Sequence, residues 1–309
     1  MAKARHGLRL QQYPRVDGFL LARPEMFPPL SPPMPIRQII DCIDRSFQRC
    51  GLKKSGKKRL VADSPEVLVE LCIQHLRTRS DPIISPYFVS LCEVDRLFEL
   101  DAVSHEMQRH RMTIGVFYQY LLLELMRQRW PVFDGSREGD IIADIETATF
   151  QPGLRLYISV KKSADTVGGQ DVPGVIRRIE SVAKEEKNLT RPYLCVICIA
   201  TPSRGKLLSY SEDRHVKCNA SGSAYSLNCE HWGPGFVFPY VTGRNAKEIY
   251  MEGIKRISAH LPFLSLKYRK ECSALLKRRL AELDLLAQDG RVAPEKFLHF
   301  CCSEHGKGR

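Results

Sequence analysis

Two short stretches decide the fold: residues 138–146 read EGDIIADIE, and residues 156–161 read LYISVK. Successive side chains of a β-strand point to opposite faces of the sheet. In the first stretch Ile141, Ala143 and Ile145 therefore share one face, while Asp140, Asp144 and Glu146 share the other. We predict that this stretch is a strand with one face in the core and one acidic face.

The second stretch is expected to pair with the first as a hairpin that closes near Pro152. Its residues Ser159 and Lys161 alternate with aliphatic residues and so share a face that points away from the core. The hairpin is expected to bring Lys161 close to Asp144. The three carboxylates and the lysine would then line one cleft.

These residue types suit hydrolysis of a phosphodiester bond. Carboxylate oxygens bind hard cations such as Mg²⁺, which contacts a phosphate and lowers the pKa of a bound water. A lysine beside the metal orients or deprotonates the attacking water and stabilises developing negative charge. Three acids on one strand face repel each other unless a cation lies between them. The sequence therefore predicts a Mg²⁺ site assisted by Lys161.

The order of predicted elements is helical first and mixed afterwards. A proline-rich arm spans residues 1–35, and apolar residues at helical spacing follow it. Helices are predicted at residues 36–50, 65–78, 86–109, 113–129, 173–187, 245–259 and 270–287, and strands at residues 140–149, 155–162, 193–200 and 236–241. The order predicts an α+β (α/β) fold with a mixed central sheet flanked by helices. We expect a helical region at residues 1–110 and a catalytic core with C-terminal helices at residues 111–309.

The charge of the chain favours a polyanionic partner. It has 47 basic and 35 acidic residues, a net charge of +12, and a basic surface concentrates nucleic acids. No apolar run approaches the roughly 18 residues of a membrane span, and no secretory signal is recognised. We expect a cytoplasmic protein without a membrane partner. The absence of a GxxxxGK[ST] motif predicts that there is no nucleotide cofactor.

The eleven cysteines do not form the pattern of a disulfide framework. Their number is odd, and Cys195 and Cys198 lie in an apolar strand, which favours reduced thiols. Zinc is not predicted either, because Cys218, Cys229 and His231 are loosely spaced and no fourth ligand accompanies them.

The motif Gly139-Asp140, followed by aliphatic residues and then by Ser159-Val160-Lys161, resembles the pattern of PD-(D/E)XK nucleases, in particular type II restriction endonucleases. A preceding amphipathic helix that contains Glu124 also matches the layout of that fold. The sequence departs from the pattern at Gly139, where a proline is usual, and at Ser159, where an acid is usual. The branch that cuts CCGG-like sites is similar, since it carries Ser-x-Lys and recruits a glutamate from the next helix.

The resemblance implies particular roles for the candidate residues. The main metal ligand is Asp140 or Asp144, and Asp140 is favoured because it stands at the strand entrance. The second acid is Glu146 or Glu180, and Lys161 assists the attacking water. The resemblance further implies a site-specific deoxyribonuclease of a restriction-modification system, which binds double-stranded DNA and Mg²⁺ as a homodimer. A repair nuclease of the same fold and a non-catalytic DNA-binding protein stay open as alternatives.

Two polar loops follow strands near the predicted cleft, at residues 163–174 and 203–206. Arginine and glutamine side chains read base edges, whereas lysine and serine more often hold phosphates. The candidate DNA-binding residues are Ser163, Gln170, Asp171, Arg177, Arg178, Arg204 and Lys206.

Overall fold

The structure is a computed structural model with a mixed α+β fold, as the sequence predicts. It describes residues 27–51, 64–78, 84–134, 140–145, 154–162, 193–202, 206–215 and 229–302. The chain forms two compact units. Unit 1 comprises Met1–Lys53 and Thr113–His260, and unit 2 comprises Lys54–Met112 and Leu261–Arg309.

This grouping differs from the expected division into residues 1–110 and 111–309. The first helix belongs to unit 1 with the sheet, and the C-terminal helices belong to unit 2 with the early helices. The physical reason is packing, because an amphipathic helix buries its apolar face against whichever partner completes a core, wherever that partner lies in the sequence.

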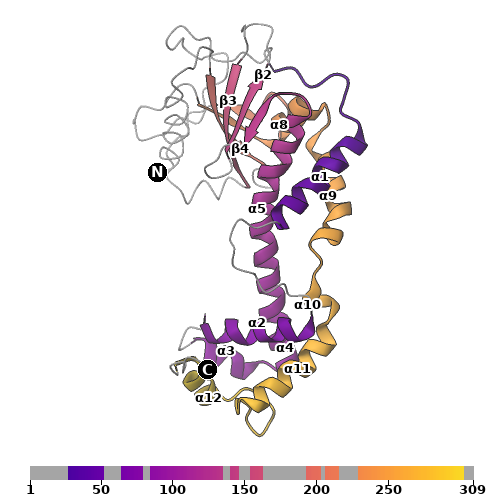
Figure 1. The fold of residues 1–309 in the computed structure, drawn as a ribbon. Helices are drawn as coiled ribbons and strands as arrows, with labels where there is room; N and C mark the ends of the chain where they lie inside the picture. The colour runs from indigo at the N-terminus through magenta and orange to yellow at the C-terminus, as the bar shows by residue number, and fades with distance from the viewer. Residues whose placement is uncertain are drawn as a thin grey trace, which may run out of the picture. The chain divides into compact units, whose positions relative to one another are not determined.

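Unit 1 is built on a mixed sheet, whose described strands follow the order β1-β2-β3-β4-β6-β5 (Figure 1). Their bounds are β1 Val132–Asp134, β2 Asp140–Ile145, β3 Leu154–Lys161, β4 Tyr193–Ile199, β5 Arg214–His215 and β6 Cys229–Trp232. Strand β2 is antiparallel to both β1 and β3, β4 is parallel to β3, and β6 is parallel to β4. Strand β5 runs antiparallel to β6 at the edge.

The alternation in the sequence explains why β2 forms a strand with one core face. Ile141, Ala143 and Ile145 are buried, whereas Asp144 is partly exposed. The described strand runs from Asp140 to Ile145, and residues 146–149 of the predicted strand lie outside the described residues.

The two inner strands are buried more fully than β2. On β3 every residue from Leu156 to Val160 is buried, so both faces of that strand are covered. Burial on both faces is the rule for strands with parallel neighbours. Cys195 and Cys198 on β4 are buried free thiols, as the sequence predicts.

The helices of unit 1 are α1 (Ile36–Gly51), the later part of α5 (Ser104–Arg127), α8 (Pro234–Thr242) and α9 (Ala246–His260). Helices α1 and α9 pack side by side (Figure 1). The predicted break near Arg111 does not occur, because α5 is continuous through that residue.

The strand predicted at residues 236–241 is wrong, because these residues form helix α8. A short apolar run does not distinguish a buried strand from a buried helix. The flanking residues do distinguish them, since Pro234 occupies the first helical turn and Gly243 ends the helix with a positive φ of 71°.

The end of the proline-rich arm lies along helix α8. The backbone N–H of Met34 donates to the carbonyl of Thr242 at 2.7 Å, and Phe27 is fully buried. The ring of Phe27 meets those of Trp232 and Tyr240 edge-on, with centroids 5.5 and 5.2 Å away. These aromatic side chains are buried and form part of the core of unit 1.

Unit 2 consists of helices around its own hydrophobic core. They are α2 (Pro65–Thr78), α3 (Ile84–Leu91), α4 (Val94–Phe98), the π-helix η3 (Glu99–Val103), the first turns of α5, α10 (Leu264–Lys267), α11 (Arg269–Glu282) and α12 (Pro294–Cys302). The predicted helix at residues 86–109 is thus divided into several pieces. The predicted helix at residues 65–78 is confirmed as α2, and at its start the Ser64 hydroxyl accepts the N–H of Val67 at 3.4 Å. None of the described helices is long and apolar enough to cross a membrane.

Candidate functional site

The register of β2 against β3 brings three candidate residues together at one end of the pair. Asp140 is directly opposite Ser159, and Lys161 follows two positions later on β3. Opposite Cα atoms of an antiparallel pair lie about 4.5–5.5 Å apart, and diagonal neighbours lie about 7–8 Å apart. Because side chains alternate along a strand, the three positions share one face of the sheet. A lysine side chain spans such a diagonal.

Asp144 lies elsewhere on this face. Its Cα partner is Arg155, six positions before Lys161, so the expectation that Lys161 lies close to Asp144 is wrong. Arg155 donates from Nε to Asp144 Oδ1 at 2.6 Å and from Nη2 to Oδ2 at 2.7 Å. Two parallel bonds of this kind form the strongest arginine–carboxylate geometry. Both carboxylate oxygens of Asp144 therefore accept hydrogen bonds from Arg155 within the hairpin.

The end of β3 that carries Lys161 is held from two sides. The N–H of Ala200 donates to the carbonyl of Lys161 at 2.9 Å, which extends the pairing with β4. From α5, the Gln119 side chain donates to the carbonyl of Val160 at 3.3 Å. Ser159 is buried with 2% exposure, whereas Lys161 is partly exposed. The lysine thus projects from a fixed backbone and retains access to solvent.

The neighbouring Lys162 provides an internal contrast. By alternation it faces the opposite side of β3, and its carbonyl accepts the Thr201 hydroxyl at 2.7 Å. Two lysines therefore stand next to each other in sequence, and only Lys161 shares a face with Asp140 and Ser159.

The residue types at this strand end fit a hard cation. In the register of β2 and β3, an aspartate position, Asp140, is opposite Ser159. Oxygen donors are what Mg²⁺ prefers, and Mg²⁺ is commonly held by one or two carboxylates together with waters. The two candidates for a second acid, Glu146 and Glu180, lie outside the described residues.

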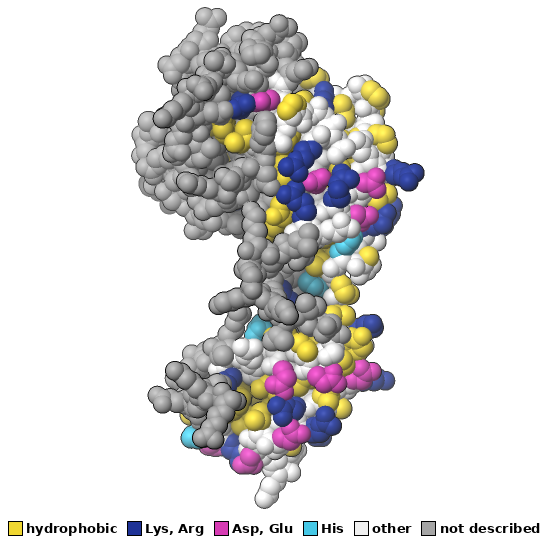
Figure 2. All heavy atoms as spheres, in the orientation of Figure 1, with side chains coloured by type: hydrophobic (Ala, Val, Ile, Leu, Met, Phe, Trp, Pro, Cys, Tyr) yellow, Lys and Arg dark blue, Asp and Glu magenta, His cyan; other side chains and the backbone are white. Residues whose placement is uncertain are grey.

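Most of the predicted DNA-binding residues also lie outside the described residues: Ser163, Gln170, Asp171, Arg177, Arg178 and Arg204. Lys206 is described and is exposed. On the face drawn in Figure 2, basic and acidic side chains alternate over α1 and α9. Pairs such as Arg256 with Asp44 and Lys255 with Glu252 account for part of this mixing. This face therefore has a mixed charge.

Glu124 on α5 is buried at the centre of an arginine cluster that the sequence did not reveal. Arg45 and Arg49 of α1 and Arg127 of α5 donate to its carboxylate at 2.9, 3.0 and 3.2 Å. Burial acts to raise the pKa of Glu124, but the hydrogen bonds from Arg45 and Arg49 outweigh it, and the pKa is lowered. The carboxylate thus fastens α1 to α5 as an ion. The spacing of Arg45 and Arg49 on one helix face was the available signal.

A scan of the sequence against models of known protein families gives no match, and a search of curated proteins finds no similar sequence. The candidate site therefore rests on the register and burial of β2 and β3.

Proposed function

We propose that the chain is a Mg²⁺-dependent DNA endonuclease whose reaction centre lies at the shared end of β2 and β3. The observation that carries the proposal is the register, which sets Asp140 opposite Ser159 and Lys161 two positions further on the same face. An acid on one strand and a Ser-x-Lys on its partner are the arrangement that the resemblance to PD-(D/E)XK nucleases implies.

The topology around the site supports the same proposal. A long helix, α5, precedes three antiparallel strands, and β4 then joins β3 in parallel. The crossover of such a parallel pair is long enough to contain a helix. Residues 173–187, where the sequence predicts that helix, lie outside the described residues.

In this mechanism Asp140 and a second acid, Glu146 or Glu180, hold the metal ion. When bound, Mg²⁺ polarises the phosphoryl oxygen and supplies an acidified water. Lys161 orients the attacking water and stabilises negative charge on the phosphate. Ser159, opposite Asp140 in the register, would contribute a hydrogen bond. Asp144 stays paired with Arg155 and maintains the hairpin.

The finer proposal is a type II restriction endonuclease that cuts double-stranded DNA as a homodimer. The net charge of +12 supports a DNA substrate. A two-fold dimer matches the symmetry of a palindromic duplex site.

A non-catalytic DNA-binding protein is the second candidate. The engagement of Asp144 by Arg155 favours it, because it removes one carboxylate from the predicted metal ligands. Ser159 stands where the nuclease pattern has an acid, which removes a second carboxylate from the expected metal ligands.

A plasmid cleavage assay with and without Mg²⁺ tests the proposal. We expect discrete fragments from the parent protein, and a loss of at least about 100-fold in rate for Lys161→Ala. The matched control is Lys162→Ala, which removes the same charge from the opposite face and should retain cleavage. DNA binding is measured by fluorescence anisotropy for all three proteins. If the plasmid stays intact in every condition while DNA binding is retained, the nuclease proposal is rejected in favour of the non-catalytic DNA-binding protein.

A further inference from the structure

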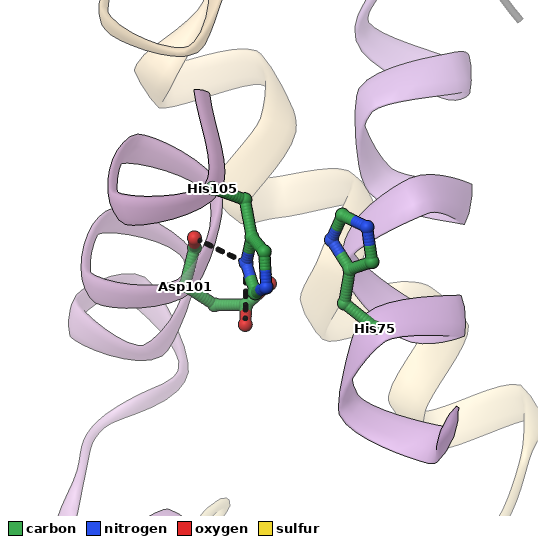
Figure 3. A group of neighbouring side chains, drawn as sticks. All are labelled: His75, Asp101 and His105. Atoms are coloured by element: carbon green, nitrogen blue, oxygen red, sulfur yellow. Dashed lines mark hydrogen bonds and ion pairs between the residues drawn. The ribbon is translucent and has the colours of Figure 1, made fainter. Parts of the chain in front are cut away.

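Three metal-ligating side chains converge in unit 2, which the proposed nuclease site does not involve. His75 lies in the last turn of α2, Asp101 lies in the π-helix η3, and His105 lies in the first turns of α5. One ligand atom from each lies within 4.8 Å of the others (Figure 3). Each of the three residues is partly buried.

Asp101 and His105 are held in place by each other. They lie four residues apart along a continuous helical stretch and so share one face. Nδ1 of His105 is 2.8 Å from the Asp101 carbonyl oxygen and 3.1 Å from Oδ1. A carbonyl oxygen only accepts hydrogen bonds, so Nδ1 is the donor, and Nε2 is the ring nitrogen left for a metal ion. Histidine ligands of metal ions are oriented in this way by a partner on the second ring nitrogen.

His75 reaches the pair from a different helix. Its ring stacks on that of His105, with centroids 3.9 Å apart and an angle of 25° between planes (Figure 3). Two imidazoles beside one carboxylate are a donor set that a divalent cation completes.

The nature of the donors identifies the class of metal. Two imidazole nitrogens and one carboxylate oxygen suit zinc and similar first-row ions, whereas Mg²⁺ and Ca²⁺ prefer oxygen alone. Tetrahedral zinc with bonds of about 2.0–2.1 Å needs donor atoms about 3.4 Å apart. The ligand atoms lie within 4.8 Å of one another, so zinc binding would require a small closing movement of the side chains.

The surroundings of the cluster add two features of a built site. Leu76 follows His75 and Ala102 follows Asp101 in sequence, and Phe98 lies three residues before Asp101. All three are buried and belong to the core of unit 2. Asp101 also lies in a π-helical turn, a local distortion of helices that is frequent at functional sites.

We propose that His75, Asp101 and His105 bind one zinc ion, which joins α2 to the η3–α5 junction and leaves a fourth position for water. This site is separate from the proposed Mg²⁺ site in residues, in unit and in metal preference. Its role in unit 2 is to fasten two helical segments that are far apart in sequence.

The test uses the full chain, stripped of metal with a chelator and kept reduced. Isothermal titration with ZnCl₂ should give one equivalent for the parent. His105→Ala and His75→Ala should each weaken binding at least about tenfold. His299→Ala, which removes an exposed histidine of unit 2, is the matched control and should bind as the parent does.

Two further readouts keep the proposal falsifiable if an alanine variant folds poorly. The bound Co²⁺ spectrum should indicate nitrogen and oxygen ligands without a thiolate band, since eleven cysteines are the competing donors. Zinc should raise the Tm of the parent and of His299→Ala, but not that of His105→Gln. The proposal would be overturned by any of three results: no stoichiometric zinc binding by the parent, a thiolate band in the Co²⁺ spectrum, or zinc affinities of the His75 and His105 variants equal to that of the parent.

Discussion

Two arginine–carboxylate pairs on the same sheet show how burial changes the role of one chemical motif. Arg214 and Glu230 on β5 and β6 bond through both oxygens at 2.7 and 2.8 Å, and their side chains are 1% and 0% exposed. Arg155 and Asp144 have the same bidentate geometry, but their side chains are 14% and 15% exposed.

The surroundings of the buried pair complete its isolation from water. The indole N–H of Trp232 also donates to Glu230 at 2.6 Å, and the guanidinium of Arg214 lies 4.2 Å from the ring centroid of Phe27. A buried charge that loses its partner has no water to replace it, whereas a partly exposed charge is rehydrated. The same bond therefore matters more for stability in the core than near the surface.

The largest effect is expected for Glu230→Gln. This change leaves the charge of Arg214 buried without its counter-ion, and the free energy of unfolding should fall by about 3–5 kcal/mol. Urea denaturation followed by circular dichroism measures it. The control is the double variant Arg214→Met with Glu230→Leu, which removes both charges and should regain most of the loss. If Glu230→Gln is at least as stable as the double variant, this explanation is contradicted.

The next effect is expected for Glu124→Gln, which weakens a cluster of three arginines that are 29–44% exposed. We expect a loss of about 2 kcal/mol at neutral pH. Because the pKa of Glu124 is lowered in the folded state, its contribution is complete above the ordinary value of 4.5. It is lost as the pH falls through the folded-state pKa. The difference in unfolding free energy between parent and variant should therefore shrink below pH 4.5, and a constant difference would exclude ionised Glu124 as its source.

A smaller effect is expected for Asp144→Asn, of about 1 kcal/mol, because Arg155 regains water when the pair is weakened. The same variant sharpens the assignment of the site. Cleavage should persist in Asp144→Asn and disappear in Asp140→Asn, in plasmid assays at equal protein concentration. Loss of cleavage in Asp144→Asn alone, in a folded protein, would move the metal ligand to Asp144.

The smallest effect is expected for Lys255→Ala at the surface. Lys255 pairs with Glu252 at 2.6 Å, yet its side chain is 61% exposed. Pairs of this kind contribute less than about 0.5 kcal/mol. Thermal unfolding should be unchanged within error, and a clear loss would show that exposure is a poor guide to these contributions.

Local patterns predicted much of the fold. The alternation at Ile141, Ala143 and Ile145 identified β2 and its core face, and Ser64-Pro65 identified the start of α2. These predictions succeeded because strand periodicity and helix capping depend on residues that are close in sequence. The helix at residues 234–242 was missed because its apolar run fits either structure, although Pro234 before it gave a usable signal.

The candidate site could be predicted only in part. The sequence brought Asp140, Ser159 and Lys161 into one hypothesis because all three belong to a single hairpin. It paired Lys161 with Asp144 instead of Asp140, because the register of a hairpin depends on where its turn closes. The arginines around Glu124 and the residues of the His75–Asp101–His105 cluster come from more than one helix each. A local pattern, such as the spacing of Arg45 and Arg49, therefore contained only part of either group.

The sequence by itself determined the mixed fold class, the strand faces and the residue types available for phosphodiester chemistry. These properties follow from side-chain periodicity and from composition, which act over a few residues. The tertiary structure alone decided that α1 belongs to the same unit as the sheet and that the C-terminal helices belong to unit 2. It also decided that Arg155 forms an ion pair with Asp144. Such choices depend on which distant surfaces bury each other and which charges meet there, and only the packed chain brings those surfaces together.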